Sequence, residues 1–91
     1  MLRTANRRLA RLAIYAAGQG LTPEPSQNVS DVYTVVLDGP QRRRVLLIYG
    51  DQGRSVDIFL VDDDAEENRQ VSQHEARDMM REAGERQRRG R

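Results

Sequence analysis

Arginine is the residue whose placement in this chain most clearly suggests chemistry. All 15 basic residues are arginines, and the chain contains no lysine. A guanidinium is a planar fork of donors that suits carboxylates and phosphates. Three blocks hold arginines without an internal acid. They are Arg3, Arg7, Arg8 and Arg11; Arg42, Arg43 and Arg44; and Arg86, Arg88, Arg89 and Arg91. Because a nucleic-acid backbone is a row of phosphates, our first hypothesis is a small non-enzymatic nucleic-acid-binding or regulatory protein that uses these arginines.

The overall charge of the chain favours a second hypothesis. The 15 basic residues are matched by 14 acidic ones, so the net charge is only +1. The acids stand in blocks that alternate with the basic blocks, and no cluster of aromatic residues accompanies the arginines to stack on bases. Alternating charge blocks can set the register of a protein partner. The alternative is therefore a protein–protein interaction module, such as an inhibitor, an adaptor or a small assembly subunit.

Candidate catalytic residues are scarce. His74 is the only histidine, and it lies beside Glu75 at the start of a predicted helix, where an exposed structural residue is expected. No second histidine completes a triad, and no serine lies in a G-x-S-x-G motif. The chain has no cysteine, which excludes thiol chemistry and cysteine-ligated zinc. We predict that the protein is not an enzyme and has no catalytic residue, cofactor or small-molecule substrate.

The one dense group of acids is a candidate cation site. It consists of Asp62, Asp63, Asp64, Glu66 and Glu67. An EF-hand loop that began at Asp62 would need glycine at its sixth position and glutamate at its twelfth, but Glu67 and Gln73 occupy them. We therefore interpret the cluster as a solvated loop and predict no metal site. Whether the loop binds a cation in another way stays open.

The spacing of apolar residues predicts the elements that position the arginines. They are a helix over 2–17, strands over 29–37, 44–49 and 55–61, and a short helix capped by Ser72 and ended by Gly84. Residues 21–28 contain two prolines and predict a linker, and the polar stretch 62–70 predicts a loop. Residues 85–91 have no apolar content and predict a disordered, arginine-rich tail.

These elements predict one α+β domain over residues 1–84. Its expected architecture is a two-layer sandwich, in which a three-stranded antiparallel meander has an N-terminal and a C-terminal helix on one face. The other face carries Val32, Thr34 and Val36, and on one reading of the register also Leu46 and Ile48. That face is more apolar than a solvent-facing surface normally is, which indicates a protein partner or a homodimer, unless the register is different.

Length and hydropathy bear on the cellular location of the protein. The chain has 91 residues, of which 37% are hydrophobic, and no apolar run approaches the roughly 20 residues that a membrane span needs. No targeting signal is evident, so we expect a cytoplasmic accessory protein of a bacterium or phage that does not bind membranes. The sequence does not choose between DNA, RNA and protein as the partner, and it does not fix the oligomeric state.

Overall fold

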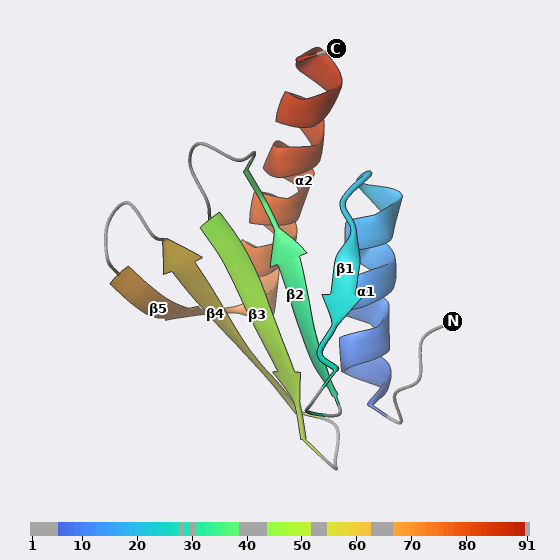
Figure 1. Ribbon diagram of the computed structural model, residues 1–91, viewed down its shortest axis with the longest axis vertical. Helices are drawn as coiled ribbons and strands as arrows, with labels where there is room; N and C mark the ends of the chain where they lie inside the picture. The colour runs from blue at the N-terminus through green and yellow to red at the C-terminus, as the bar shows by residue number, and fades with distance from the viewer. Residues whose placement is uncertain are drawn as a thin grey trace.

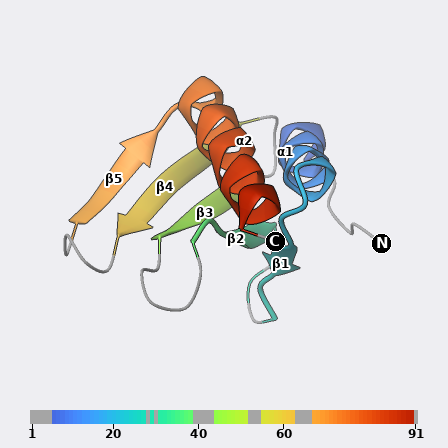
Figure 2. The ribbon, with the colours of Figure 1, turned by 90° about the horizontal axis from the view of Figure 1, so that it is seen from above.

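The computed structural model in Figure 1 describes residues 6–27, 29, 31–38, 44–51, 55–62 and 67–90. Five strands form one antiparallel sheet in the order of the chain, and a helix stands at each end of the sequence. Figure 2 shows both helices on the same face of the sheet. The elements are α1 (Arg7–Gly18), β1 (Pro23–Pro25), β2 (Val32–Val36), β3 (Arg44–Gly50), β4 (Val56–Asp62), β5 (Glu67–Val71) and α2 (Gln73–Arg89).

The predicted α+β class is confirmed, but the predicted number of strands is wrong, because the sheet has five strands and not three. The first additional strand, β1, lies in the predicted linker and pairs with β2 through Pro23, Glu24 and Pro25. Proline is tolerated in an edge strand because its missing N–H can face solvent. The predicted linker is therefore an edge strand over these three residues.

The second additional strand, β5, lies in the predicted polar loop and pairs with β4 from Ile58↔Val71 to Asp62↔Glu67. Asn68, Arg69 and Gln70 are exposed, and only Val71 is buried. A strand at the end of a sheet has a neighbour on one side only, so it can carry such a polar sequence. The segment is a strand because its backbone pairs with β4, although its hydropathy pattern does not predict a strand.

The hydrophobic core lies between the sheet and the two helices. On α1, the predicted apolar face of Leu9, Leu12, Ala13 and Ala16 is fully buried. The sheet and α2 contribute further buried residues, which are Tyr33, Val35, Leu37, Leu46, Ile48, Ile58, Leu60, Val71, Ala76, Met80 and Ala83. Met79 is only partly buried against this core. Leu46 and Ile48 therefore face the helices, which corrects the reading that placed them on the open face.

The first helix is shorter than predicted within the described residues. It starts at Arg7, with Asn6 as its N-cap, and the expected helical residues 2–5 lie outside the described part of the chain. The strand predicted over 29–37 is also shorter, because β2 begins only at Val32 and ends at Val36. Val29 lies outside β2 and is 56% exposed. In the part of the chain that the structure describes, neither α1 nor α2 is long and apolar enough to cross a membrane.

The second helix begins as predicted and continues further. Ser72 Oγ accepts a hydrogen bond from the Glu75 N–H at 3.1 Å, and the Glu75 carboxylate accepts one from the Ser72 N–H at 3.4 Å. This reciprocal pair is the expected capping box. However, α2 runs through Gly84 to Arg89, so Gly84 does not end the helix, and residues 85–89 are helical instead of a disordered tail.

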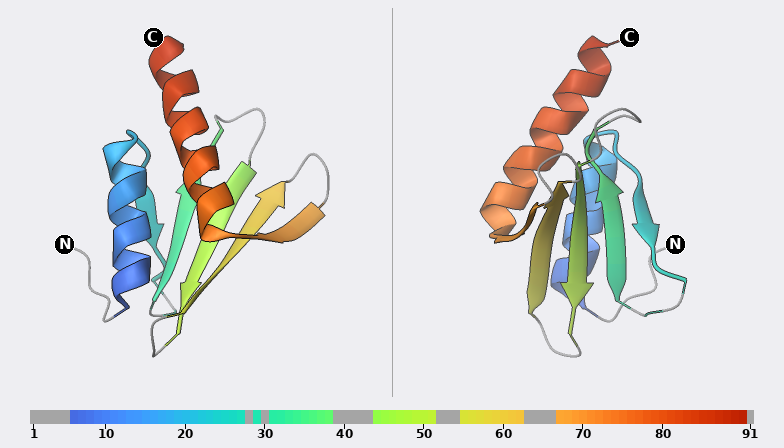
Figure 3. Two further views of the ribbon diagram at one scale, coloured as in Figure 1. Left: turned by 180° about the vertical axis from the view of Figure 1, so that it is seen from behind. Right: turned by 60° about the vertical axis from the view of Figure 1, so that its left-hand side comes forward.

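Gly84 lies at a close approach between α2 and the C-terminal end of α1. A Cβ atom at position 84 would lie 2.3 Å from the backbone carbonyl oxygen of Gln19, the C-cap residue of α1. Further along the helix pair, the Arg77 guanidinium lies 5.0 Å from the centre of the Tyr15 ring, which is a cation–π distance. The left view of Figure 3 shows the two helices side by side in front of the sheet. The glycine therefore serves helix packing and not helix termination.

Candidate interaction surface

The first arginine block lies partly on the exposed side of α1. Arg7, Arg8 and Arg11 are all exposed, and the helix from Arg7 to Gly18 contains no acidic residue. Within the described part of the chain, no ion pair joins any of the three to a carboxylate. Arg3 lies outside the described residues. The structure thus presents three cations of this block together on one helix.

The second and third blocks meet at one carboxylate, that of Asp38. Arg44 Nε donates to Asp38 Oδ2 at 2.6 Å, and Arg44 Nη2 donates to Asp38 Oδ1 at 3.3 Å. Arg86 Nη2, from α2, donates to the same Oδ1 at 3.0 Å. Arg44 and Arg86 are therefore held by an acid of the same chain and are less available to a phosphate. Arg42 and Arg43 lie outside the described residues.

The Asp38 carboxylate stays ionised because of this arrangement. Its side chain is only 15% exposed. The hydrogen bond from Arg44 is the largest cause that holds the pKa of Asp38 below its ordinary value of 3.8, and the charges of Arg44 and Arg86 act in the same direction. A depressed carboxyl pKa adds stability above the ordinary pKa, and that stability is lost as the pH falls through the depressed value. The cluster joins β2, β3 and α2 over the whole neutral range.

Two further arginines of the third block, Arg88 and Arg89, lie at the end of α2. Arg88 Nη1 donates to the Gln19 carbonyl oxygen at 3.3 Å, where the C-terminal end of α1 attracts a cation. Arg89 is exposed, and Arg91 lies outside the described residues. The predicted arginines therefore do not converge on one surface. Those of α1 face solvent, whereas Arg44, Arg86 and Arg88 contact groups of their own chain.

The sheet face that turns away from the helices is the other candidate surface, and we call it the outer face. Side chains alternate between the two faces of a strand, so the outer face is made by the residues between the buried ones. The strand register aligns them in rows across the sheet. They are Glu24, Val32, Thr34, Val36, Val45, Leu47, Tyr49, Asp57, Phe59, Val61, Asn68 and Gln70.

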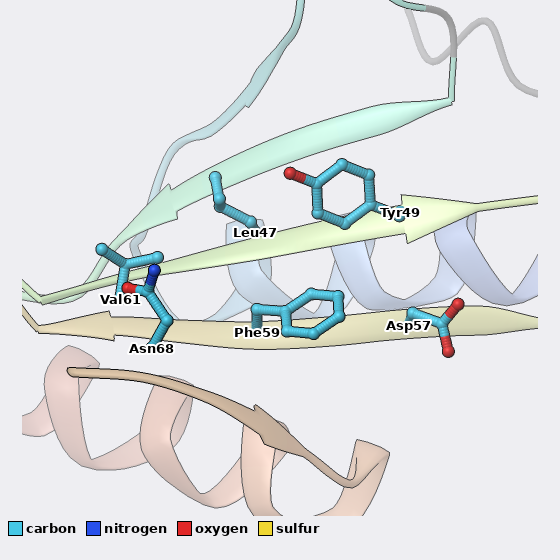
Figure 4. A pocket seen from close by; sticks show the side chains of 6 residues that line it. All are labelled: Leu47, Tyr49, Asp57, Phe59, Val61 and Asn68. Atoms are coloured by element: carbon cyan, nitrogen blue, oxygen red, sulfur yellow. The ribbon is translucent and has the colours of Figure 1, made fainter.

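The centre of the outer face is a shallow apolar hollow between β3 and β4. It has a volume of about 460 Å³ and is lined by Leu47, Tyr49, Asp57, Phe59, Val61 and Asn68. Figure 4 shows these side chains on the side of the sheet opposite the helices. The rings of Tyr49 and Phe59 pack edge to face, with centroids 5.8 Å apart and an interplanar angle of 79°. Tyr49 remains 39% exposed.

Polar groups lie at the margin of this hollow. Gln70 Nε2 donates to Asp57 Oδ1 at 3.3 Å, which orients the carboxylate at one end of β4. The free edges of the sheet differ from each other. The β1 edge carries two prolines, which block strand addition, whereas β5 is polar and carries the Arg69–Glu75 ion pair of 3.1 Å. The apolar area is therefore on the outer face and not along an edge.

The other sequence-based candidates gain no site among the described residues. His74 has an 88% exposed side chain, and its Nε2 lies 3.4 Å from the Asp78 carboxylate one turn along α2. No group of three or more histidine, aspartate or glutamate side chains in the described residues is placed to hold a metal ion. Asp62 ends β4 and Glu67 begins β5, and Asp63, Asp64 and Glu66 lie outside the described part of the chain.

These observations define the class of the molecule. It is a small single-domain α+β protein in which two helices cover one face of a five-stranded antiparallel sheet and leave the other face uncovered. No protein-family model, no curated protein and no solved structure matches the chain. Two surfaces are therefore the candidates for its function: the exposed arginines of α1 and the outer face of the sheet.

Proposed function

We propose that this protein is a protein–protein interaction module that binds another polypeptide through the outer face of its sheet. The observation that carries the proposal is the apolar centre of a face that neither helix covers. The exposed face of an antiparallel sheet normally carries polar side chains. Here it carries valine at four positions together with Leu47, Tyr49 and Phe59.

The energetics of burial support the same proposal. Each Å² of apolar surface removed from water contributes about 25 cal/mol, so covering a surface of this kind favours association. Aromatic residues are enriched where interfaces are fully buried, and Tyr49 and Phe59 occupy the centre of the outer face. An inhibitor, an adaptor or a small assembly subunit would use the face in this way.

The proposal predicts where the protein forms cross-links in the cells that produce it. A photoreactive phenylalanine analogue in place of Phe59 should give light-dependent covalent adducts on a denaturing gel. The same analogue in place of Ile14 is the matched control, because Ile14 is 61% exposed and belongs to α1, which lies on the other face of the sheet. Adducts of equal yield from both positions, or none from position 59, would contradict the proposal.

Nucleic-acid binding is a second candidate function, and the exposed arginines of α1 favour it. Arg7, Arg8 and Arg11 present three guanidiniums on a helix without an acid. Guanidiniums in such an arrangement can contact successive phosphates of a backbone. This form of the hypothesis is narrower than the one drawn from all eleven arginines, because Arg44 and Arg86 are bound to Asp38.

Fluorescence anisotropy with labelled duplex DNA, duplex RNA and single strands tests this second candidate. Three phosphate contacts on a duplex should weaken binding about 40-fold between about 50 and 200 mM salt. Replacing Arg7 and Arg11 with alanine should abolish the binding. Replacing Arg69 and Arg81, which are paired with Glu75 and Asp78, removes the same charge and should leave most of the binding intact. Equal losses in both double variants would mean that only net charge matters.

A further inference from the structure

We propose that the occupant of the outer face is a second copy of this chain, bound face to face as a two-fold symmetric dimer. This inference rests on the proposed function and names the partner that the outer face takes. Most soluble oligomers close through such a two-fold interface, in which the same patch of both copies is buried. Three properties of the face lead to this partner: its charge, its symmetry and its area.

Charge is the first property. The only charged residues on the described outer face are Glu24, on the edge strand β1, and Asp57, which lines the hollow near the start of β4. No arginine stands among the described residues of this face, although arginine makes up 15 of the 91 residues of the chain. An acidic or phosphorylated partner would find no cation among these described residues, and a basic partner would find at the hollow only the Asp57 carboxylate, which already accepts a hydrogen bond from Gln70. A largely apolar surface with so few charges is best matched by another of the same kind.

Symmetry is the second property. The proposed two-fold axis lies between the two packed sheets, parallel to the strands, and passes over the apolar hollow between β3 and β4. It therefore sets β3 of one copy opposite β4 of the other copy. In the paired register, Leu47 of one copy then lies opposite Phe59 of the other, and Val45 lies opposite Val61. Asp57 lies opposite Tyr49, whose hydroxyl can donate to the carboxylate. The face is therefore complementary to itself, without two like charges in contact.

Area is the third property. Strands lie about 4.8 Å apart and rise about 3.4 Å per residue, so β2 to β5 cover a plane of roughly 400 Å². Because side chains project from the plane, the accessible surface of the face is larger than the plane. Two copies together would bury on the order of 1,000 Å², which is the lower size of a specific interface. Packed sheets of two copies would resemble a β-sandwich with a helical layer on each outside.

The mass of the protein in solution tests the inference. Sedimentation velocity and light scattering between about 1 and 500 µM should show a concentration-dependent shift from 10.4 kDa to twice that mass, as a small interface dissociates on dilution. The Leu47→Arg variant and the Phe59→Asp variant should each remain monomeric. The Ile14→Arg variant alters an exposed aliphatic side chain on α1, outside the outer face, and should dimerise like the wild type. Circular dichroism and melting curves verify that each variant is folded.

Mixing the two outer-face variants tests the symmetry directly. The proposed axis sets position 47 of one copy opposite position 59 of the other, so Leu47→Arg and Phe59→Asp introduce opposite charges at facing positions. An equimolar mixture should recover a dimer that neither variant forms alone. Dimerisation of the wild type without this recovery would overturn the proposed axis.

The outcomes also separate this inference from the proposed function. A wild-type protein that is monomeric at every concentration overturns the dimer, whatever the variants do. If the analogue at position 59 still forms cross-links, but only to other polypeptides, the proposed function remains and the second copy is rejected. If the protein is monomeric and position 59 forms no cross-links, both proposals fail.

Discussion

The Gly84→Ala variant is expected to be less stable than the wild type by about 2 kcal/mol, which lowers the melting temperature by roughly 10 °C. Two effects of opposite sign compete at this position. Alanine in a helix interior is favoured over glycine by about 1 kcal/mol. However, the new Cβ would lie 2.3 Å from the Gln19 carbonyl oxygen. That oxygen belongs to the backbone and cannot rotate away, so α1 and α2 must separate, and the steric effect should dominate.

Gly18→Ala is the matched control for this prediction. Gly18 is also a helical glycine, but a Cβ atom there would meet nothing within 4 Å. Only the propensity gain should remain, so this variant should be as stable as the wild type or slightly more stable. Thermal and urea unfolding followed by circular dichroism would measure both. A Gly84→Ala protein that gains stability like Gly18→Ala would show that the helices do not pack as closely as described.

The elements that hydropathy predicted are those with a one-sided or continuous apolar pattern. The helical spacing of Leu9, Leu12 and Ala16 placed the buried face of α1 correctly, because a helix beside a core needs one apolar stripe. The central strands were found because they are apolar at nearly every position. The Ser72 capping box was found because its signal is local, within four residues.

The elements that were missed depend on partners distant in sequence. The edge strand β1 contains two prolines and the edge strand β5 is mostly polar, so neither has the hydropathy pattern of a strand. They are strands because their backbones pair with β2 and β4. The close approach of Gln19 to Gly84 joins residues from the two ends of the chain. Local sequence signals therefore predicted that Gly84 ends the helix, because glycine is the residue that most often follows the last turn of a helix.

The candidate surfaces were predicted in part for the same reason. An apolar outer face was expected at Val32, Thr34 and Val36, and the structure places these residues there. The phase of β3 was not predictable, since all residues from Val45 to Tyr49 are apolar and no alternation shows which of them face inward. The arginine blocks were interpreted as phosphate-binding because no acid lies inside them, but Asp38 and Arg86 are 48 residues apart in sequence, and only the fold brings them together.

The Asn6→Ala variant is expected to lose about 2–3 kcal/mol of stability, because one side chain has two structural roles. Asn6 Oδ1 accepts a hydrogen bond from the Leu9 N–H at 3.0 Å and so caps α1. Asn6 Nδ2 donates to the Ser55 carbonyl at 2.9 Å and to the Asp51 carbonyl at 3.1 Å, at the ends of β3 and β4. The residue is only 1% exposed, so water does not easily replace these partners.

The Asn6→Ser variant separates the two roles. Serine caps a helix about as well as asparagine, but its hydroxyl is too short to reach both the Asp51 and the Ser55 carbonyls. Urea unfolding should therefore place Asn6→Ser between the wild type and Asn6→Ala, about 1 kcal/mol above the alanine variant. Asn6→Asp keeps the capping oxygen, but it sets a carboxylate oxygen against two carbonyls that need a donor, so it should be less stable than Asn6→Ser. If Asn6→Ser matched the wild type, capping alone would explain the residue, and the contacts that attach α1 to β3 and β4 would add nothing to stability.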